Sequence, residues 1–287
     1  MSAVENIILT FSCDDQPGIV AAVANAFVLQ GFNLRESSQF EDVHTRRFFM
    51  RSVFESIEGS KSLDAIKTSF QPLADRYKMT WGIYDKHIKP KALIAVSQWE
   101  HCLSHLLNNW RQGSLPIDIV GVISNHEVLR PLCQWYKIPF HFLPVDKSSK
   151  PEQEKKIMAL MQSEQADFLV LARYMQILSN DLCTQLNGKA INIHHSFLPG
   201  FKGAKPYHQA YDRGVKLIGA TAHYVTTDLD EGPIIEQNVE RVSHANTPEE
   251  LVQIGQDIES MVLNRAVRWH AEYRVLLNGQ KTVVFDR

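Results

Sequence analysis

The sequence of 287 residues is poor in cysteine, almost without net charge and without long apolar runs. Its four cysteines (Cys13, Cys102, Cys133 and Cys183) stand singly, which excludes a disulfide framework or a Cys-x-x-Cys zinc site and is typical of a reduced compartment. The 30 Lys and Arg residues nearly balance the 32 Asp and Glu residues, so no basic field predicts a nucleic-acid partner. No apolar run approaches the roughly 20 residues that cross a bilayer, and Glu5 without a basic region argues against a signal peptide. We therefore expect a soluble cytoplasmic protein with neither a nucleic-acid nor a membrane partner.

Residues 1–84 have the pattern of a small domain of their own. Strands are expected at 6–13, 33–40, 48–54 and 79–84, and helices at 19–31 and 62–77. The resulting order β-α-β-β-α-β is that of a ferredoxin-like fold. Residues 85–90 form a short charged linker that ends in proline, and such segments separate domains.

Residues 91–287 alternate strands with helices and form the second expected domain. Strands are expected at 92–96, 117–123, 140–143, 168–171, 190–194 and 220–225, and helices at 100–110, 127–136, 151–165, 206–213 and from 247 onward. The alternation predicts an α/β fold with a Rossmann-like, doubly wound parallel sheet. Ligands of such sheets lie beyond the carboxyl ends of the strands. A turn-rich crossing is expected at 198–203, and a β-hairpin around Asn278-Gly279. Thr247-Pro248-Glu249-Glu250 predicts a capping box at the start of the last helix.

The stretch 190–237 contains the residues with the clearest chemistry. Asn192 and His194 alternate along a strand and should point to the same side of it. An amide donor beside an imidazole can hold a developing oxyanion. His223 lies in the next strand, and Asp230 lies in the loop after it. An Asp beside a His orients the ring and favours its charged form.

A family resemblance is clear at these residues. The motif that carries it reads Asn192-x-His194, Ser196-x-Leu198-Pro199 and Leu229-Asp230-x-Gly232-Pro233. It resembles the folate-dependent formyltransferase family over residues 91–237. The resemblance implies that Asn192, His194 and Asp230 are catalytic residues. The sequence His-His-Ser at 194–196 is similar to the deformylases of that family, because the transferases commonly have a proline after the catalytic His.

The same resemblance implies where the folate substrate binds. Met175, Gln176 and Leu178 would line its pterin pocket, and His223 would lie near the reacting group. Transferases commonly have Arg at the position of Gln176, so a side-chain contact does not follow there. We expect no metal, because the sequence has no His-Glu-x-x-His helix and no dense set of ligands. No cofactor is implied either, since the folate is itself substrate and product.

The first domain resembles an ACT domain. The residues that carry this likeness are Asp14-x-x-Pro17-Gly18-Ile19 and Gly31-x-Asn33. The resemblance implies an amino-acid effector, with glycine and methionine as candidates, at Asp14 and Gly18, where free N–H groups at a helix start favour an anionic group. The alternative is a tight turn that helps to pair domains between subunits. ACT domains generally pair, so a homo-oligomer is expected.

The turn at 97–102, Ser-Gln-Trp-Glu-His-Cys, bears on which molecule accepts the formyl group. In glycinamide ribonucleotide transformylases of the family, this turn is glycine-rich and holds the acceptor's phosphate. Here the turn has no glycine, Trp99 fills it and Glu100 would repel an anion. We therefore expect water as the acceptor. The implied reaction is hydrolysis of 10-formyltetrahydrofolate to formate and tetrahydrofolate, in support of purine synthesis and one-carbon balance.

Two other functions remain open. A formyltransferase acting on an amine would release no formate without its acceptor. An amino-terminal ACT-like domain is foreign to the methionyl-tRNA formyltransferases of the family, which argues against that form of the alternative. A non-catalytic sensor of folate and an amino acid would bind without turnover. The sequence also leaves open whether Asp230 or a histidine is the general base. His195, which alternation places on the other side of the strand end from His194, has no assigned role.

Overall fold

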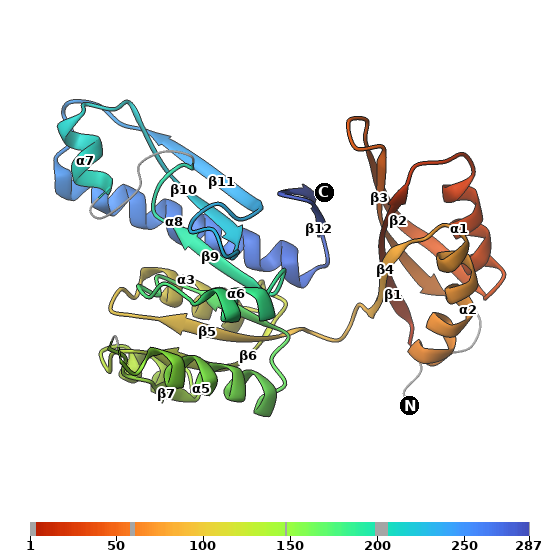
Figure 1. The fold of residues 1–287 in the computed structure, drawn as a ribbon, viewed down its shortest axis with the longest axis horizontal. Helices are drawn as coiled ribbons and strands as arrows, with labels where there is room; N and C mark the ends of the chain where they lie inside the picture. The colour runs from red at the N-terminus through yellow and green to blue at the C-terminus, as the bar shows by residue number, and fades with distance from the viewer. Residues whose placement is uncertain (1–3, 58–60, 147, 199–205, 287) are drawn as a thin grey trace. The chain divides into compact units, whose positions relative to one another are not determined.

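The computed structural model describes residues 4–57, 61–146, 148–198 and 206–286, and contacts divide the chain into two compact units (Figure 1). One unit contains Met1–Lys89, Glu272–Asn278 and Val283–Arg287, and the other contains Pro90–Ala271 and Gly279–Thr282. The contacts divide the chain between Lys89 and Pro90, within the linker expected between residues 84 and 91. The domain limits themselves remain our proposal. The contacts add that part of the carboxyl-terminal segment groups with the first unit.

The first unit has a four-stranded antiparallel sheet in the order β2-β3-β1-β4. Its elements are β1 (Asn6–Asp14), α1 (Ile19–Val28), β2 (Phe32–Asp42), β3 (Arg47–Ser56), α2 (Leu63–Arg76) and β4 (Thr80–Asp85). This order confirms the predicted β-α-β-β-α-β fold. Phe27 of α1 stacks on Phe54 of β3 with ring centroids 4.1 Å apart, and both lie fully buried in the core with Phe70 of α2.

The predicted carboxyl-terminal hairpin is present. Strands β12 (Val275–Asn278) and β13 (Lys281–Val284) pair, and Gly279 in the turn between them has a φ of 62°. A left-handed residue at this place is what glycine permits without strain. Asn278 Nδ2 donates to Asp42 Oδ2 at 2.7 Å, so this segment bonds to β2 within the first unit.

The second unit has a seven-stranded sheet in the order β11-β10-β9-β8-β5-β6-β7. Its strands are β5 (Lys91–Val96), β6 (Asp118–Ser124), β7 (Phe140–Phe142), β8 (Phe168–Leu171), β9 (Ala190–His194), β10 (Leu217–Tyr224) and β11 (Ile234–Arg241). Its helices are α3 (His101–Arg111), α4 (Arg130–Trp135), α5 (Lys150–Ser163), α6 (Asn180–Gln185), α7 (Pro206–Asp212) and α8 (Pro248–Ala271). Of the turn expected at 198–203, only Leu198 lies within the described residues.

The predicted parallel sheet is confirmed for the strands from β9 to β7. Strands β10 and β11 differ, because β10 runs antiparallel to both of its neighbours. Strand direction is fixed by pairing between distant segments, and an alternation of elements along the chain does not contain that information. The reversal matters for the site, since it sets the residues of β10 directly opposite those of β9.

Helix α8 packs on β10, β11 and α3. It begins with the predicted capping box, in which Glu250 N donates to Thr247 Oγ1 at 3.2 Å and Thr247 N donates to Glu250 Oε2 at 2.9 Å. Its buried face is largely apolar but also includes the carboxylate of Glu259. Although α8 has 24 residues, no helix within the described ranges is both long and apolar enough to cross a membrane.

Candidate active site

Strand β9 turns two polar side chains toward one side of the sheet. Asn192 and His194 alternate with Ile191 and Ile193, which are buried in the core. His194 is 5% exposed and Asn192 is partly buried. The alternation predicted from the sequence therefore holds, and both polar groups lie where water is scarce.

Strand β10 holds the Asn192 amide through His223. The antiparallel register pairs His223 with Asn192 and Thr221 with His194. His223 Nδ1 lies 2.9 Å from the Tyr224 carbonyl oxygen, so this nitrogen donates, and Nε2 accepts from Asn192 Nδ2 at 3.2 Å. Burial lowers the pKa of His223, which keeps the ring neutral as this tautomer requires. One amide hydrogen of Asn192 is thereby held by His223, which fixes the orientation of the amide and leaves its second hydrogen to donate elsewhere.

The loop after β10 brings Asp230 to the same place. Asp230 has a φ of 58°, and its Oδ1 lies 3.2 Å from His194 Nδ1 and 3.9 Å from His223 Nε2. A Cβ added at Gly232 would lie 1.7 Å from the Tyr224 carbonyl oxygen. Only glycine at 232 lets the loop pass this close to β10.

Within the pair of Asp230 and His194, the pKa of the carboxyl group is lowered, whereas one ring nitrogen of His194 has no hydrogen-bond partner among the described residues. The hydrogen bond from His194 lowers the pKa of Asp230, although burial acts in the opposite direction. His194 Nε2 is buried and has no hydrogen-bond partner among the described residues. A buried polar atom left unpaired costs free energy, so this nitrogen is available to an oxygen of a bound molecule.

His195 does not lie on the opposite side from His194, and that expectation is wrong. The two rings stack, with centroids 5.0 Å apart and planes 30° from parallel. Strand β9 ends at His194 and the chain bends at His195, so strict alternation no longer applies there. Burial, followed by the charge of Arg173, lowers the pKa of His195 to about 4.

The segment expected to contact a pterin lies beside the turn after β5. Met175 N donates to Ser97 Oγ at 2.9 Å, and Ser97 Oγ in turn donates to Asn125 Oδ1 at 2.7 Å. Met175 is 52% exposed, Gln176 is partly buried and Leu178 belongs to the core. Their contacts with a folate remain predictions. Sequence reasoning missed Ser97, because a serine at the end of a strand is a weak signal.

The turn after β5 borders a shallow hollow. The hollow measures about 450 Å³ and is lined by Gln98, Trp99, His126, Glu127 and Val128. Its lining contains a carboxylate but neither Lys nor Arg. Such a lining offers no strong site for a phosphate group.

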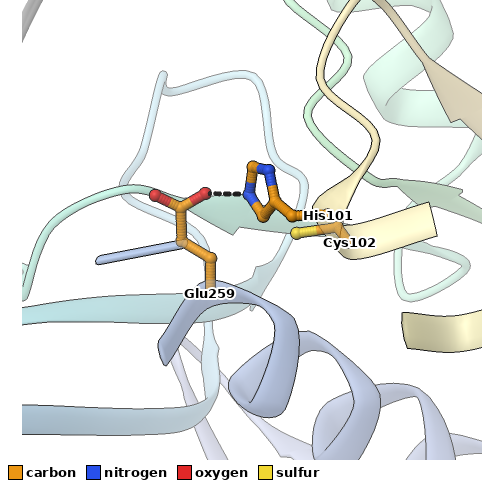
Figure 2. A group of neighbouring side chains, drawn as sticks. All are labelled: His101, Cys102 and Glu259. Carbon is orange, nitrogen blue, oxygen red and sulfur yellow. Dashed lines mark hydrogen bonds and ion pairs between the residues drawn. The ribbon is translucent and has the colours of Figure 1, made fainter. Parts of the chain in front are cut away.

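Figure 2 shows the His, Cys and Glu side chains that come within reach of one cation in the described part of the chain, namely His101, Cys102 and Glu259. The Glu259 carboxylate accepts from His101 Nε2 at 2.8 Å and from the Tyr207 hydroxyl at 2.6 Å. Arg173 Nε lies 3.4 Å from the same carboxylate. Because a guanidinium already compensates the negative charge, we assign no metal to this group.

The expected effector residues lie in the first unit. Asp14 Oδ1 lies 3.1 Å from Arg47 Nη1, and Gly18, with a φ of 90°, directly precedes α1. The turn has the conformation that a glycine allows. Its role in binding an amino acid remains a prediction.

The sequence matches known families over both units. The formyl transferase family model matches residues 90–267, and the ACT domain model matches residues 7–69. The chain is 48% identical to the formyltetrahydrofolate deformylase of Corynebacterium sp. (strain P-1) over 277 residues, covering 96% of this chain and 97% of that relative. The chain belongs to the formyltetrahydrofolate deformylase family. Both resemblances drawn from the motifs are thereby confirmed.

Solved structures show the same relationship. The formyltetrahydrofolate deformylase from Burkholderia mallei is 49% identical with a TM-score of 0.94, covering 98% of this chain and 99% of its own. A glycinamide ribonucleotide transformylase from Symbiobacterium toebii is 27% identical with a TM-score of 0.64, covering 69% of this chain and 94% of its own. The likeness to the deformylase therefore extends over nearly the whole chain, whereas the likeness to the transformylase covers only part of it.

Proposed function

We propose that this chain hydrolyses 10-formyltetrahydrofolate to formate and tetrahydrofolate, with water as the formyl acceptor. Membership of the deformylase family supports both the substrate and the reaction. The observation that carries the proposal is the pairing of His194 Nδ1 with Asp230 Oδ1 at 3.2 Å. It leaves the buried His194 Nε2 without a partner among the described residues, beside the directed amide of Asn192.

In this scheme Asn192 and protonated His194 stabilise the oxyanion that forms when water attacks the formyl carbon. The Asn192 amide is held by His223 Nε2 at 3.2 Å before any substrate arrives. Preorganised donors of this kind each contribute about 100-fold or more to the rate. Asp230 favours the charged form of His194 through their hydrogen bond.

Asp230 is the general base that we favour. Both nitrogens of His223 are engaged, and His194 serves as a donor, so Asp230 and His195 remain as candidates. Asp230 bonds directly to His194 and so lies beside the oxyanion, which favours it over the stacked ring of His195. The proton of water passes to the base, the C–N bond breaks, and the folate nitrogen takes a proton and leaves as an amine.

Water is favoured over an amine by the surroundings of the turn after β5. Trp99 occupies the turn, the Glu127 carboxylate in the hollow is already paired with Arg130, and Glu100 adds a negative charge directly after Trp99. His101 is already bonded to Glu259 at 2.8 Å and is not available to an anion. A phosphate-bearing acceptor would therefore lack a favourable site.

Formate release without any added acceptor tests the proposal. We expect formate and tetrahydrofolate in equal amounts, with His194→Ala as the matched inactive control. A formyltransferase would stay silent until an amine is supplied, and a folate sensor would bind without product. Either result with well-folded protein would overturn the proposal.

The proposal extends to regulation, assembly and location. The ACT domain match supports an amino-acid effector, glycine or methionine, at the turn of Asp14 and Gly18, and supports pairing into a homo-oligomer. We also propose a cytoplasmic location and no requirement for a metal. Repeating the formate assay with each amino acid and with a chelator, and measuring the mass in solution, tests these points.

A further inference from the structure

A row of three residues crosses the sheet of the second unit at the end of β9. Strands β9, β10 and β11 are neighbours in this sheet (Figure 1). His194, the last residue of β9, pairs with Thr221 of β10, and Thr221 pairs in turn with Gln237 of β11. Beyond His194 the chain bends at 195–196 and leaves the strand.

The side chains of this row point to one face of the sheet. Directly opposite residues of antiparallel strands share a face, with Cβ atoms about 4.5–5.5 Å apart. Thr221 therefore lies beside His194, on the face that also contains the opposed pair of His223 and Asn192. Thr221 is 0% exposed. A hydroxyl is thus buried next to the ring that we propose to stabilise the oxyanion.

The Thr221 hydroxyl holds the turn that follows β9. Leu198 N donates to Thr221 Oγ1 at 3.0 Å, and Thr221 Oγ1 donates to the Ser196 carbonyl oxygen at 3.0 Å. Ser196 and Leu198 are each 5% exposed, so the turn is buried. A side chain of β10 thereby continues the pairing past the point at which β9 ends.

Gln237 completes this network of hydrogen bonds. Its Nε2 donates to Thr221 Oγ1 at 2.9 Å and to the Leu198 carbonyl oxygen at 3.0 Å. A hydroxyl has one hydrogen to donate and two lone pairs that accept, and an amide nitrogen has two hydrogens to donate. All of these are used. Because a carbonyl only accepts and a backbone N–H only donates, the direction of each bond is fixed, and the turn is held in one arrangement.

The position of the His194 ring depends on this turn. Asp230 Oδ1 lies 3.2 Å from His194 Nδ1, and the His195 ring stacks on the His194 ring with centroids 5.0 Å apart. His195 directly precedes the bonded segment 196–198, so a shift of that segment moves the stacked ring. A displacement of about 1 Å at a reacting group can lower a rate by about 100-fold.

We infer that Thr221 and Gln237 are positioning residues, whose side chains fix the turn at 196–198 and thereby hold the His194 ring in the geometry that the oxyanion requires. The inference rests on the proposed function, because it assigns both residues a role in orienting a group of that reaction. His194 Nε2 has no hydrogen-bond partner among the described residues, so its direction follows from the position of the ring.

Two substitutions at Thr221 separate positioning from stability. Thr221→Val keeps the shape of the side chain but removes the hydroxyl, so we expect kcat to fall about tenfold, with the affinity for tetrahydrofolate nearly unchanged. Thr221→Ser keeps the hydroxyl but removes a buried methyl group, so Tm should fall while most of kcat is retained. Steady-state formate release, folate binding and thermal unfolding measure these effects.

Thr247→Val is the matched control, because it is the same chemical change in the same unit. Thr247 Oγ1 accepts from Glu250 N at 3.2 Å at the start of α8. Its loss should lower Tm by removing a helix cap, without changing kcat. Gln237→Met removes both donated hydrogens without adding a charge, and we expect it to lower kcat several-fold with folate affinity retained.

Failure of the inference and failure of the proposed function are distinguishable. If the unsubstituted protein releases no formate, the proposed function itself fails. If it releases formate and Thr221→Val has an unchanged kcat, or Thr221→Ser loses as much of it, the network is only structural and the inference is overturned. Should Thr221→Val not fold, Gln237→Met decides by the same readout, since an unchanged kcat there would equally overturn the inference.

Discussion

Two carboxylates of the second unit hold histidines in opposite ways. The side chain of Asp230, on a loop, is 18% exposed and bonds to His194, whose other nitrogen has no partner among the described residues. Glu259, in a helix, is 1% exposed and accepts from both His101 and Tyr207. The first arrangement becomes complete only when another molecule supplies an oxygen, whereas the second is complete within the chain. Asp230 therefore holds a histidine that can still bond to another molecule, whereas the Glu259 carboxylate makes its hydrogen bonds within the chain.

Removing the two histidines should produce the sharpest contrast. We expect His194→Ala to lower kcat by about 100-fold or more, because it removes an oxyanion donor, while folate affinity changes little. His101→Ala should instead act mainly on Tm, since it removes one of the two hydrogen bonds that the buried Glu259 carboxylate accepts. Formate assays and thermal unfolding of both variants measure this. A larger kcat loss in His101→Ala than in His194→Ala would invert the comparison.

Substitution of His223, which holds the Asn192 amide, should have a smaller effect on turnover than the loss of His194. His223→Ala removes the acceptor that directs the Asn192 amide, so we expect kcat to fall roughly tenfold, with KM nearly unchanged. His223→Gln offers an amide oxygen to Asn192 and should recover part of the rate. Steady-state kinetics of the three proteins check this, and equal rates in the Ala and Gln variants would speak against an orienting role.

Displacing the loop that carries Asp230 should have a still smaller effect on turnover. Gly232→Ala places a Cβ against the Tyr224 carbonyl oxygen, so the loop must shift and Asp230 must move with it. We expect a several-fold lower kcat and a Tm lower by a few degrees. Gly113→Ala is the matched control, because Gly113 has a φ of 75° and open space around it. An unchanged kcat in Gly232→Ala would show that the loop tolerates displacement.

The sequence predicted the parts of the site that depend on local pattern. Alternation along β9 placed Asn192 and His194 together, and the family motif pointed to Asp230. The hold of His223 on Asn192 was missed, because it follows from the antiparallel register of β10, which no local pattern encodes. Glu259 was missed for a related reason, since its partners His101 and Tyr207 lie 158 and 52 residues away in the sequence.

The fold shows the same division between local and long-range information. The ferredoxin-like order, the hairpin around Gly279 and the capping box of Thr247 and Glu250 were all predicted from short stretches of sequence. The direction of β10 and the stacking of His195 on His194 were not. Both depend on where a strand ends and what it pairs with, rather than on the residues within it.

The measurement that tests the central claim most directly is the turnover of Asp230→Asn, made alongside its affinity for tetrahydrofolate. The substitution keeps the shape of the side chain but removes the charge that pairs with His194 at 3.2 Å. We predict a kcat lower by about 100-fold or more with folate affinity retained. A kcat close to that of the unsubstituted protein would contradict the account.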